Sequence, residues 1–181
     1  MAPSRPGDDS GGNVMAVQIY NTLSRRKVPF VPLNPPKVHI YNCGPTVYDH
    51  FHIGNARNFV AMDIVRRYLI YRGYEVRYIQ NLTDIDDKII DRANTENIRT
   101  EDVTARFIPH YFEDAAKLRI READHHPRAT EHIGDIIGLI EKLVEKELAY
   151  ESNGSVYFSV RSFPKYGRLS GRSIDSMLQL S

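Results

Sequence analysis

The chain has 181 residues, of which 41% are hydrophobic and 26% are charged, a composition that is ordinary for a soluble globular protein. Its 24 Lys and Arg residues are balanced by 23 Asp and Glu residues, which excludes the strong overall positive field that concentrates nucleic acid around a protein. Any contact with RNA is therefore expected to be local.

The cysteine content and the length of the apolar runs indicate the cellular compartment of the protein. A single cysteine cannot form an intrachain disulfide, which fits a reducing compartment. No stretch approaches the roughly 18 apolar residues that a membrane span requires, so no membrane contact is expected. Residues 1–14 lack the apolar core of a signal peptide and are predicted to be a disordered lead, with Met15 available as a second start. The default expectation is a cytoplasmic protein of unknown oligomeric state.

The first elements are predicted to be β-strands. Residues 17–23, "VQIYNTL", are expected to include a short strand, and the proline-rich residues 29–36 cannot pair as a central strand. Residues 37–41, "KVHIY", alternate apolar and polar side chains and are rich in β-formers. This strand is closed by Asn42, Cys43, Gly44 and Pro45.

A helix and a second strand follow. Apolar side chains recur at helical spacing over residues 55–72, Gly73 supplies a C-terminal cap, and residues 74–80 form the next predicted strand. Strand, helix and strand make a right-handed βαβ unit with parallel strands. The strand ends at Cys43 and Thr83 should therefore open on the same edge of the sheet, where ligands bind in open α/β sheets.

The rest of the chain is predicted to be mostly helical. Helices are expected over residues 86–94, 100–118 and 130–150, the last with Thr130 as N-cap and an apolar face. Asn153-Gly154 between two β-rich runs indicates a hairpin. No third parallel strand is predicted, and a two-stranded parallel core is not expected to stand alone.

The stretch "HFHIGNAR", residues 50–57, could bind phosphate. A helix that begins at Gly54 offers unpaired backbone N–H groups, and His52 can donate a hydrogen bond to a developing oxyanion. The alternative is a plain strand-to-helix turn with solvated histidines. The glycine patterns of dinucleotide-binding and Walker loops are absent.

Cys43 leaves three interpretations open. It can be a small buried hydrophobe, a nucleophile with His50 or His52 as base, or a zinc ligand in the spacing Cys43-x6-His50-x-His52. The spacing lacks a clear fourth ligand.

Carboxylates gather after the second strand, in "NLTDIDDK". Asp84, Asp86 and Asp87 could hold magnesium, although acidic residues at a helix start also complement the helix dipole, and the second interpretation is favoured. The βαβ geometry directs Thr83 into the cleft. The remaining histidines are expected at the surface or at helix ends: His110, His125, His126 and His132.

Together these stretches resemble the amino-terminal half of cysteinyl-tRNA synthetases. The resemblance runs from Val17 to Arg172 and rests on "YNCGPTVYDHFHIGNAR", "GYEVRYIQNLTDIDDKII", "PRATEHI" and "YGRLSGR". It implies a class I aminoacyl-tRNA synthetase of α/β fold. Residues 15–99 would form the first half of a Rossmann-like catalytic domain, and residues 100–181 a mostly helical connective insertion.

The resemblance also implies an activity and a set of site residues. Such enzymes condense L-cysteine with magnesium-bound ATP to cysteinyl adenylate and then transfer the cysteinyl group to tRNA(Cys). Cys43 matches the first ligand of a zinc ion that binds the substrate thiolate. The HIGH-type box that contacts ATP is matched by His52, Ile53, Gly54 and Asn55, with His52 and Asn55 as catalytic residues, and the substrate pocket by Gly44, Thr46 and Thr83.

The sequence departs from the family pattern in two ways. Asn55 stands where the box is named for histidine, and an asparagine still donates a hydrogen bond. The chain also ends before the expected further zinc ligands, the KMSKS-type loop and the anticodon-binding domain. We therefore expect an incomplete enzyme that by itself neither holds zinc tightly nor charges tRNA.

Three alternatives remain at the level of sequence. The first is a non-catalytic nucleotide-binding or interaction module. The second is a related ligase that passes cysteine to an amino sugar, and the third is a small zinc protein that uses Cys43, His50 and His52.

Overall fold

The computed structural model describes residues 17–178, which divide into two compact units. One unit is Pro32–His132, and the other contains residues 17–31 and 133–178. The predicted lead over residues 1–14 and the second start at Met15 lie outside the described residues. Within the described range, no helix has both the length and the apolar character needed to cross a membrane.

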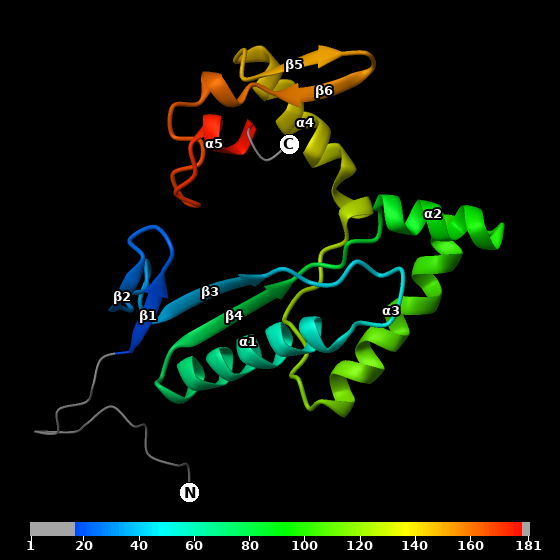
Figure 1. Cartoon of the computed structure of the whole chain (residues 1–181). Helices are drawn as coiled ribbons and strands as arrows, with labels where there is room; N and C mark the ends of the chain where they lie inside the picture. Colours follow the sequence, from blue (N-terminus) through cyan, green and yellow to red (C-terminus); the bar gives the residue numbers. More distant parts are fainter. Residues whose placement is uncertain (1–16, 179–181) are drawn as a thin grey trace, which may run out of the picture. The chain divides into compact units, whose positions relative to one another are not determined.

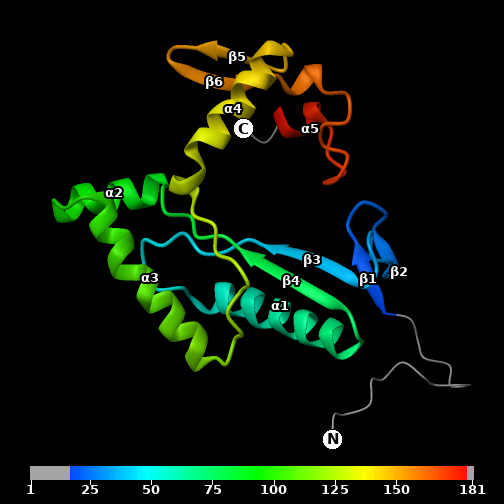
Figure 2. The same ribbon diagram turned by 180° about the vertical axis from the view of Figure 1, so that it is seen from behind.

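The first unit is built on the predicted βαβ motif. Strands β3 (Lys37–Asn42) and β4 (Glu75–Gln80) pair in parallel, in a register that runs from Lys37 opposite Glu75 to Asn42 opposite Gln80. Helix α1 (Ile53–Tyr71) connects them and lies along the strand pair in both ribbon views (Figures 1 and 2). The predicted helix, parallel pairing and α/β character are thus confirmed, and the carboxyl ends of both strands meet at one edge.

Residues 124–128 pair with β4 on its other side. Two isolated parallel bridges join Ile79 to His125 and Leu82 to Arg128, and the N–H of Gln80 donates to the His125 carbonyl at 3.1 Å. The sheet proper has two strands, but this segment covers the edge of β4. The expectation that His126 lies at the surface is wrong, because both of its ring nitrogens are buried.

An arginine of α1 anchors the segment that leads to these bridges. The Arg66 side chain is only 1% exposed, and it donates to the backbone carbonyls of Arg121 and Glu122. It also forms an ion pair of 2.8 Å with Asp124, whose other oxygen accepts from the Tyr78 N–H. The buried guanidinium is thereby neutralised, and both of its terminal nitrogens are hydrogen-bonded.

Two helices complete this unit, namely α2 (Asp87–Glu96) and α3 (Thr100–Lys117). They pack against each other through a cluster that consists of Ile89, Ala93, Val103 and Phe107. A second cluster ties α1 and α3 to the ends of the strands and contains Val47, Phe59, Leu82 and Tyr111. The core therefore supports the loops that follow β3 and β4.

The second unit contains two antiparallel hairpins and short helices. Its strands are β1 (Gln18–Asn21) with β2 (Arg26–Pro29), and β5 (Ala149–Ser152) with β6 (Ser155–Phe158). Its helical elements are α4 (Ile133–Glu145), the 3₁₀ turn η2 (Val160–Ser162) and α5 (Ile174–Leu178). The predicted hairpin turn is confirmed, since Asn153 and Gly154 both have positive φ, as a two-residue turn of this type requires.

The predicted start of the last long helix is corrected. Thr130 does not cap α4, because it lies in the 3₁₀ turn η1 (Ala129–His132) and its hydroxyl donates to Asp84 at 2.5 Å. The sequence pattern of α4 is amphipathic, yet none of its described residues is buried. Periodicity predicted the helix correctly but could not show what its apolar face contacts.

Candidate functional site

The loops that follow β3 and β4 lie side by side at the shared edge. Thr46 and Thr83 form a parallel bridge, the Val47 N–H donates to the Thr83 carbonyl at 3.1 Å, and the Thr83 N–H donates to the Pro45 carbonyl at 3.0 Å. The structure thus brings together two of the predicted pocket residues, Thr46 and Thr83, although they are far apart in sequence.

Gly44 is required by a close backbone approach. A methyl group added to its Cα would overlap the carbonyl oxygen of Asn81, in the loop after β4. Backbone atoms cannot move aside as the end of a flexible side chain can, so a larger residue at position 44 would push the two loops apart. All three predicted pocket residues therefore belong to one contact between the loops.

Cys43 is exposed at this edge, so its interpretation as a buried hydrophobe is wrong. Its thiol donates to the Gly44 carbonyl at 3.7 Å. Within residues 17–178, no group of three or more His, Cys, Asp or Glu side chains is arranged to hold a metal ion. The described residues therefore do not by themselves fit the zinc site that the resemblance implies, since Cys43 offers a single ligand.

His50 is directed to α3, where its Nδ1 lies 3.4 Å from the Asp114 carboxylate and its ring lies against that of His110 at a centroid distance of 4.6 Å. The pKa of the Asp114 carboxyl is lowered, chiefly by a hydrogen bond from Lys117 and then by His50. These contacts make His50 an anchor between the loop and α3, and they do not support a site that joins Cys43, His50 and His52.

The start of α1 is a capping box made by the HIGH-type residues. His52 is the N-cap, and its Nδ1 accepts the Gly54 N–H at 3.0 Å, while the Asn55 side-chain oxygen accepts the His52 N–H at 3.3 Å. This pattern satisfies two of the amide groups that a helix start leaves unpaired. The helix begins at Ile53, two residues before the predicted start at Asn55.

The cap determines which atoms of His52 and Asn55 remain for a ligand. Because Nδ1 of His52 accepts a hydrogen bond, the proton of the neutral ring is assigned to Nε2, which can donate outward. The oxygen of Asn55 is engaged in the cap, so its amide nitrogen is the group that can donate. Gly54 makes room for this arrangement, since a Cβ there would lie 2.8 Å from the His52 ring.

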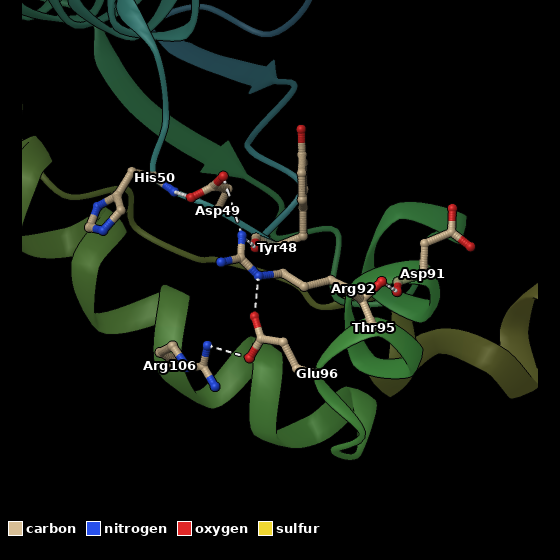
Figure 3. A network of polar contacts seen from close by, with 8 residues as sticks. All are labelled: Tyr48, Asp49, His50, Asp91, Arg92, Thr95, Glu96 and Arg106. Atoms are coloured by element: carbon tan, nitrogen blue, oxygen red, sulfur yellow. Dashed lines mark hydrogen bonds and ion pairs between the residues drawn. The ribbon is translucent and has the colours of Figure 1, made fainter.

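The loop before the cap is held by Arg92 of α2, a residue that the sequence did not indicate. Its guanidinium donates to the Tyr48 carbonyl at 2.9 Å, lies 3.2 Å from the Asp49 carboxylate and donates to Glu96 at 2.8 Å. Figure 3 shows Arg92 between Asp49 and Glu96, with Arg106 of α3 on the far side of Glu96. Nothing in the local sequence distinguishes Arg92 from an exposed helix residue.

Electrostatics and packing reinforce this network. The pKa of the Glu96 carboxyl lies below its ordinary value, first because of the hydrogen bond from Arg92 and second because of the one from Arg106. The Arg92 guanidinium also stacks over the Phe107 ring, 4.5 Å from its centroid, a favourable cation–π contact. Through these contacts α2 and α3 fix the loop from which His52 projects.

The carboxylates after β4 have structural contacts. Asp84 is buried and accepts from the N–H and hydroxyl of Thr130, and Asp86 is the N-cap of α2, where it accepts the Lys88 N–H at 3.0 Å. Asp87 lies in the first turn of α2. Asp86 and Asp87 therefore fit the interpretation that acidic residues stabilise a helix start, whereas Asp84 binds the 3₁₀ turn η1.

Comparison with known proteins gives a consistent result. Residues 29–180 match the family model described as tRNA synthetases class I (C) catalytic domain. A cysteine–tRNA ligase of Gloeothece citriformis is 54% identical over 90% of this chain, and one of Sulfurihydrogenibium sp. is 52% identical over 91%. A third, from Anoxybacillus flavithermus, is 52% identical over 90%. The aligned part is 34–35% of each relative, so the chain spans about a third of the length of the curated relatives it matches.

Proposed function

This chain belongs to the cysteine–tRNA ligase family of class I synthetase catalytic domains, and on that premise we propose that it contributes the ATP- and cysteine-binding edge of such a ligase. The proposed reaction joins the carboxylate of L-cysteine to the α-phosphate of magnesium-bound ATP and releases pyrophosphate. The cysteinyl group then passes from the adenylate to the 3′ end of tRNA(Cys). We propose that residues 15–99 form the first half of a Rossmann-like domain and that residues 100–181 belong to a connective insertion.

The capping box at the start of α1 is the observation that carries this proposal. The helix N-terminus supplies a partial positive charge, and the outward Nε2–H of His52 and the amide of Asn55 add two hydrogen-bond donors. Donors held in place before the substrate arrives need no reorganisation as negative charge develops on a phosphate oxygen. We assign ATP contacts to His52, Gly54 and Asn55, with His52 and Asn55 as the catalytic residues.

The adjoining loop contact is the proposed cysteine pocket. We place the substrate beside Gly44, Thr46 and Thr83, and we propose Cys43 as one ligand of a zinc ion. Zinc prefers a soft thiolate to a hydroxyl, which offers a far larger discrimination between cysteine and serine than an apolar pocket could. The described residues supply only this one donor, so the other zinc ligands would have to come from elsewhere.

The ATP assignment can be tested by substitution of His52 in this chain. His52→Asn keeps a side chain that caps helices well but removes the imidazole Nε2–H. We expect it to weaken ATP binding, measured by saturation-transfer NMR with magnesium and ATP, by at least roughly tenfold, the loss of one charge-assisted hydrogen bond. His39→Ala, an exposed position in the middle of β3, serves as the matched control and should bind ATP as the unaltered chain does.

A second measurement separates the loss of the imidazole from a loss of helix structure. Circular dichroism of His52→Asn should show the helix content unchanged, so that a loss of ATP binding reports the missing imidazole. If the unaltered chain binds no ATP, or if His52→Asn binds it equally well, the assignment of the HIGH-type box to ATP is wrong for this protein.

A further inference from the structure

One asparagine side chain spans the two loops of the proposed pocket. The Asn81 oxygen accepts the Gly44 N–H at 2.9 Å, and its amide nitrogen donates to the Thr83 hydroxyl at 3.1 Å. Asn81 itself follows β4, whereas Gly44 follows β3, so the side chain crosses from one strand end to the other. Among the described residues, Asn81 is thus the side chain that accepts the Gly44 N–H, while the carbonyl of Gly44 accepts from the Cys43 thiol.

We infer that Asn81 is a positioning residue that holds the Cys43–Gly44 turn and the Thr83 hydroxyl at a fixed separation. This inference rests on the proposed function, because it takes Gly44 and Thr83 to be pocket residues. Asn81 acts through these two neighbours, because its side chain bonds to the Gly44 N–H and the Thr83 hydroxyl. An amide is suited to the task because it offers an acceptor and a donor on one rigid plane.

The backbone leaves little freedom for another arrangement. The Asn81 carbonyl oxygen lies so close to the Gly44 Cα that a side chain could not be added there. Main-chain hydrogen bonds from Val47 to Thr83 and from Thr83 to Pro45 also join the two loops. The side chain of Asn81 therefore links loops that already touch, and its loss should loosen their relative position more than it unfolds them.

Asn81 also fixes the direction in which the Thr83 hydroxyl can donate. Because the Asn81 amide occupies one lone pair of the Thr83 oxygen, the hydroxyl hydrogen must point away from Asn81. A hydroxyl oriented in this way can distinguish the polar groups of an amino acid that enters the proposed pocket. We thus assign to Asn81 both the direction of the Thr83 hydroxyl and the separation between Gly44 and Thr83.

The test measures coupling between positions 44 and 83 in the chain without any substrate. In the unaltered background, Thr83→Val should shift the NMR amide proton of Gly44, because the hydroxyl and the Gly44 amide are joined through Asn81. In the Asn81→Ala background, the same change should have no effect on that proton. Asn81→Ala alone should speed Gly44 amide exchange by roughly fivefold, the loss of one hydrogen bond.

Two further variants separate positioning from simple destabilisation. Thr46→Val is the matched control, since Thr46 faces Thr83 in the bridge while the Asn81 side chain bonds to Gly44 and Thr83. The effect of Thr46→Val on Gly44 should be the same with or without Asn81. Asn81→Asp keeps the acceptor for the Gly44 N–H, so it should restore slow exchange of that amide.

The possible outcomes are distinct. A Thr83→Val effect on Gly44 that persists in the Asn81→Ala background overturns the inference, as does unchanged Gly44 exchange in Asn81→Ala. Because no ATP or cysteine is present, such a failure leaves the proposed function untouched. Conversely, a failure of the ATP experiment on His52 would remove the proposed function while the coupling measurement still reports whether Asn81 joins the loops.

Discussion

Single residues at the shared edge are constrained by contacts that their sequence context does not reveal. Gly54 was expected to admit a phosphate, and it also leaves room for the His52 ring that caps α1. Gly44 was expected near the substrate, and it is also required by the carbonyl of Asn81. In both cases the glycine is explained by its neighbours in the fold, whether or not a ligand is bound.

Gly44→Ala should destabilise the first unit. Because the new methyl group would meet a backbone carbonyl, we expect the free energy of unfolding to fall by about 1–3 kcal/mol, the usual cost of overpacking. Urea unfolding followed by the fluorescence of the tyrosines would measure it. Gly134→Ala in α4, where an added Cβ meets nothing within 4 Å, is the control and should leave stability unchanged or raise it by about 1 kcal/mol. Equal stability of Gly44→Ala and the unaltered chain would contradict the close approach.

At the scale of elements, the loop between β3 and α1 is held from three sides. The loop after β4 contacts it through the Thr46–Thr83 bridge, α2 through Arg92, and α3 through the contact of His50 with Asp114. A loop with this many partners is ordered before a ligand arrives, which is the condition for preorganised donors. The elements that provide the partners come from as far away as residue 114.

Arg92→Lys should loosen this loop although the charge is retained. A lysine has no planar fork and cannot reach the Tyr48 carbonyl and Glu96 together, so we expect a loss of about 1–2 kcal/mol in the free energy of unfolding. Amide exchange over residues 49–54 should also become faster. The control is Arg99→Lys, because Arg99 is 75% exposed and pairs only within the start of α3, where less than about 1 kcal/mol is at stake. If both variants behave alike, the Arg92 network does not hold the loop.

At the scale of the whole molecule, the first unit includes a segment that follows α3 in the chain and packs back onto α1, α3 and β4. The segment over residues 121–128 is bound by Arg66 of α1 and by backbone bridges to β4, and its His126 packs against Tyr111 and Phe112 of α3. Burial lowers the pKa of His126, while the Gln80 backbone and Glu122 oppose the shift and His125 adds to it. A histidine with a depressed pKa in the folded state makes stability depend on pH.

The sign of that dependence follows from linkage. The unfolded chain takes up a proton on His126 near its ordinary pKa of about 6.5, whereas the folded chain resists protonation, so the free energy of unfolding should decrease as the pH falls below this value. His126→Phe should show a smaller decrease between pH 8 and pH 5 in denaturant titrations. An exposed histidine that does not act on His126 provides the control, and His39→Gln in β3 should keep the slope of the unaltered chain. A slope that His126→Phe does not change would exclude His126 as its source.

The local sequence pattern was sufficient to predict much of the structure of the first unit. The alternation in residues 37–41, the helical spacing in residues 55–72 and the length between the strands predicted a parallel βαβ motif, and parallel pairing alone places the ends of β3 and β4 on one edge. The Asn153-Gly154 turn was equally predictable from the sequence, because its backbone conformation depends on two adjacent residues. The grouped motifs around Cys43, His52 and Thr83 also indicated the family, which residues 29–180 match.

Features that depend on partners distant in sequence were not predictable in this way. The N-cap role given to Thr130 was wrong because Asp84, 46 residues earlier, binds its hydroxyl, and His126 was misplaced because its burial depends on α3. The roles of Arg92 and Asn81 arise in the same manner, from contacts between chain segments that only folding brings together. The sequence by itself therefore determined the local elements, which short-range sterics and side-chain periodicity control. Only the tertiary structure decided which polar groups face each other across the edge, since hydrogen bonds and ion pairs are set by position in space.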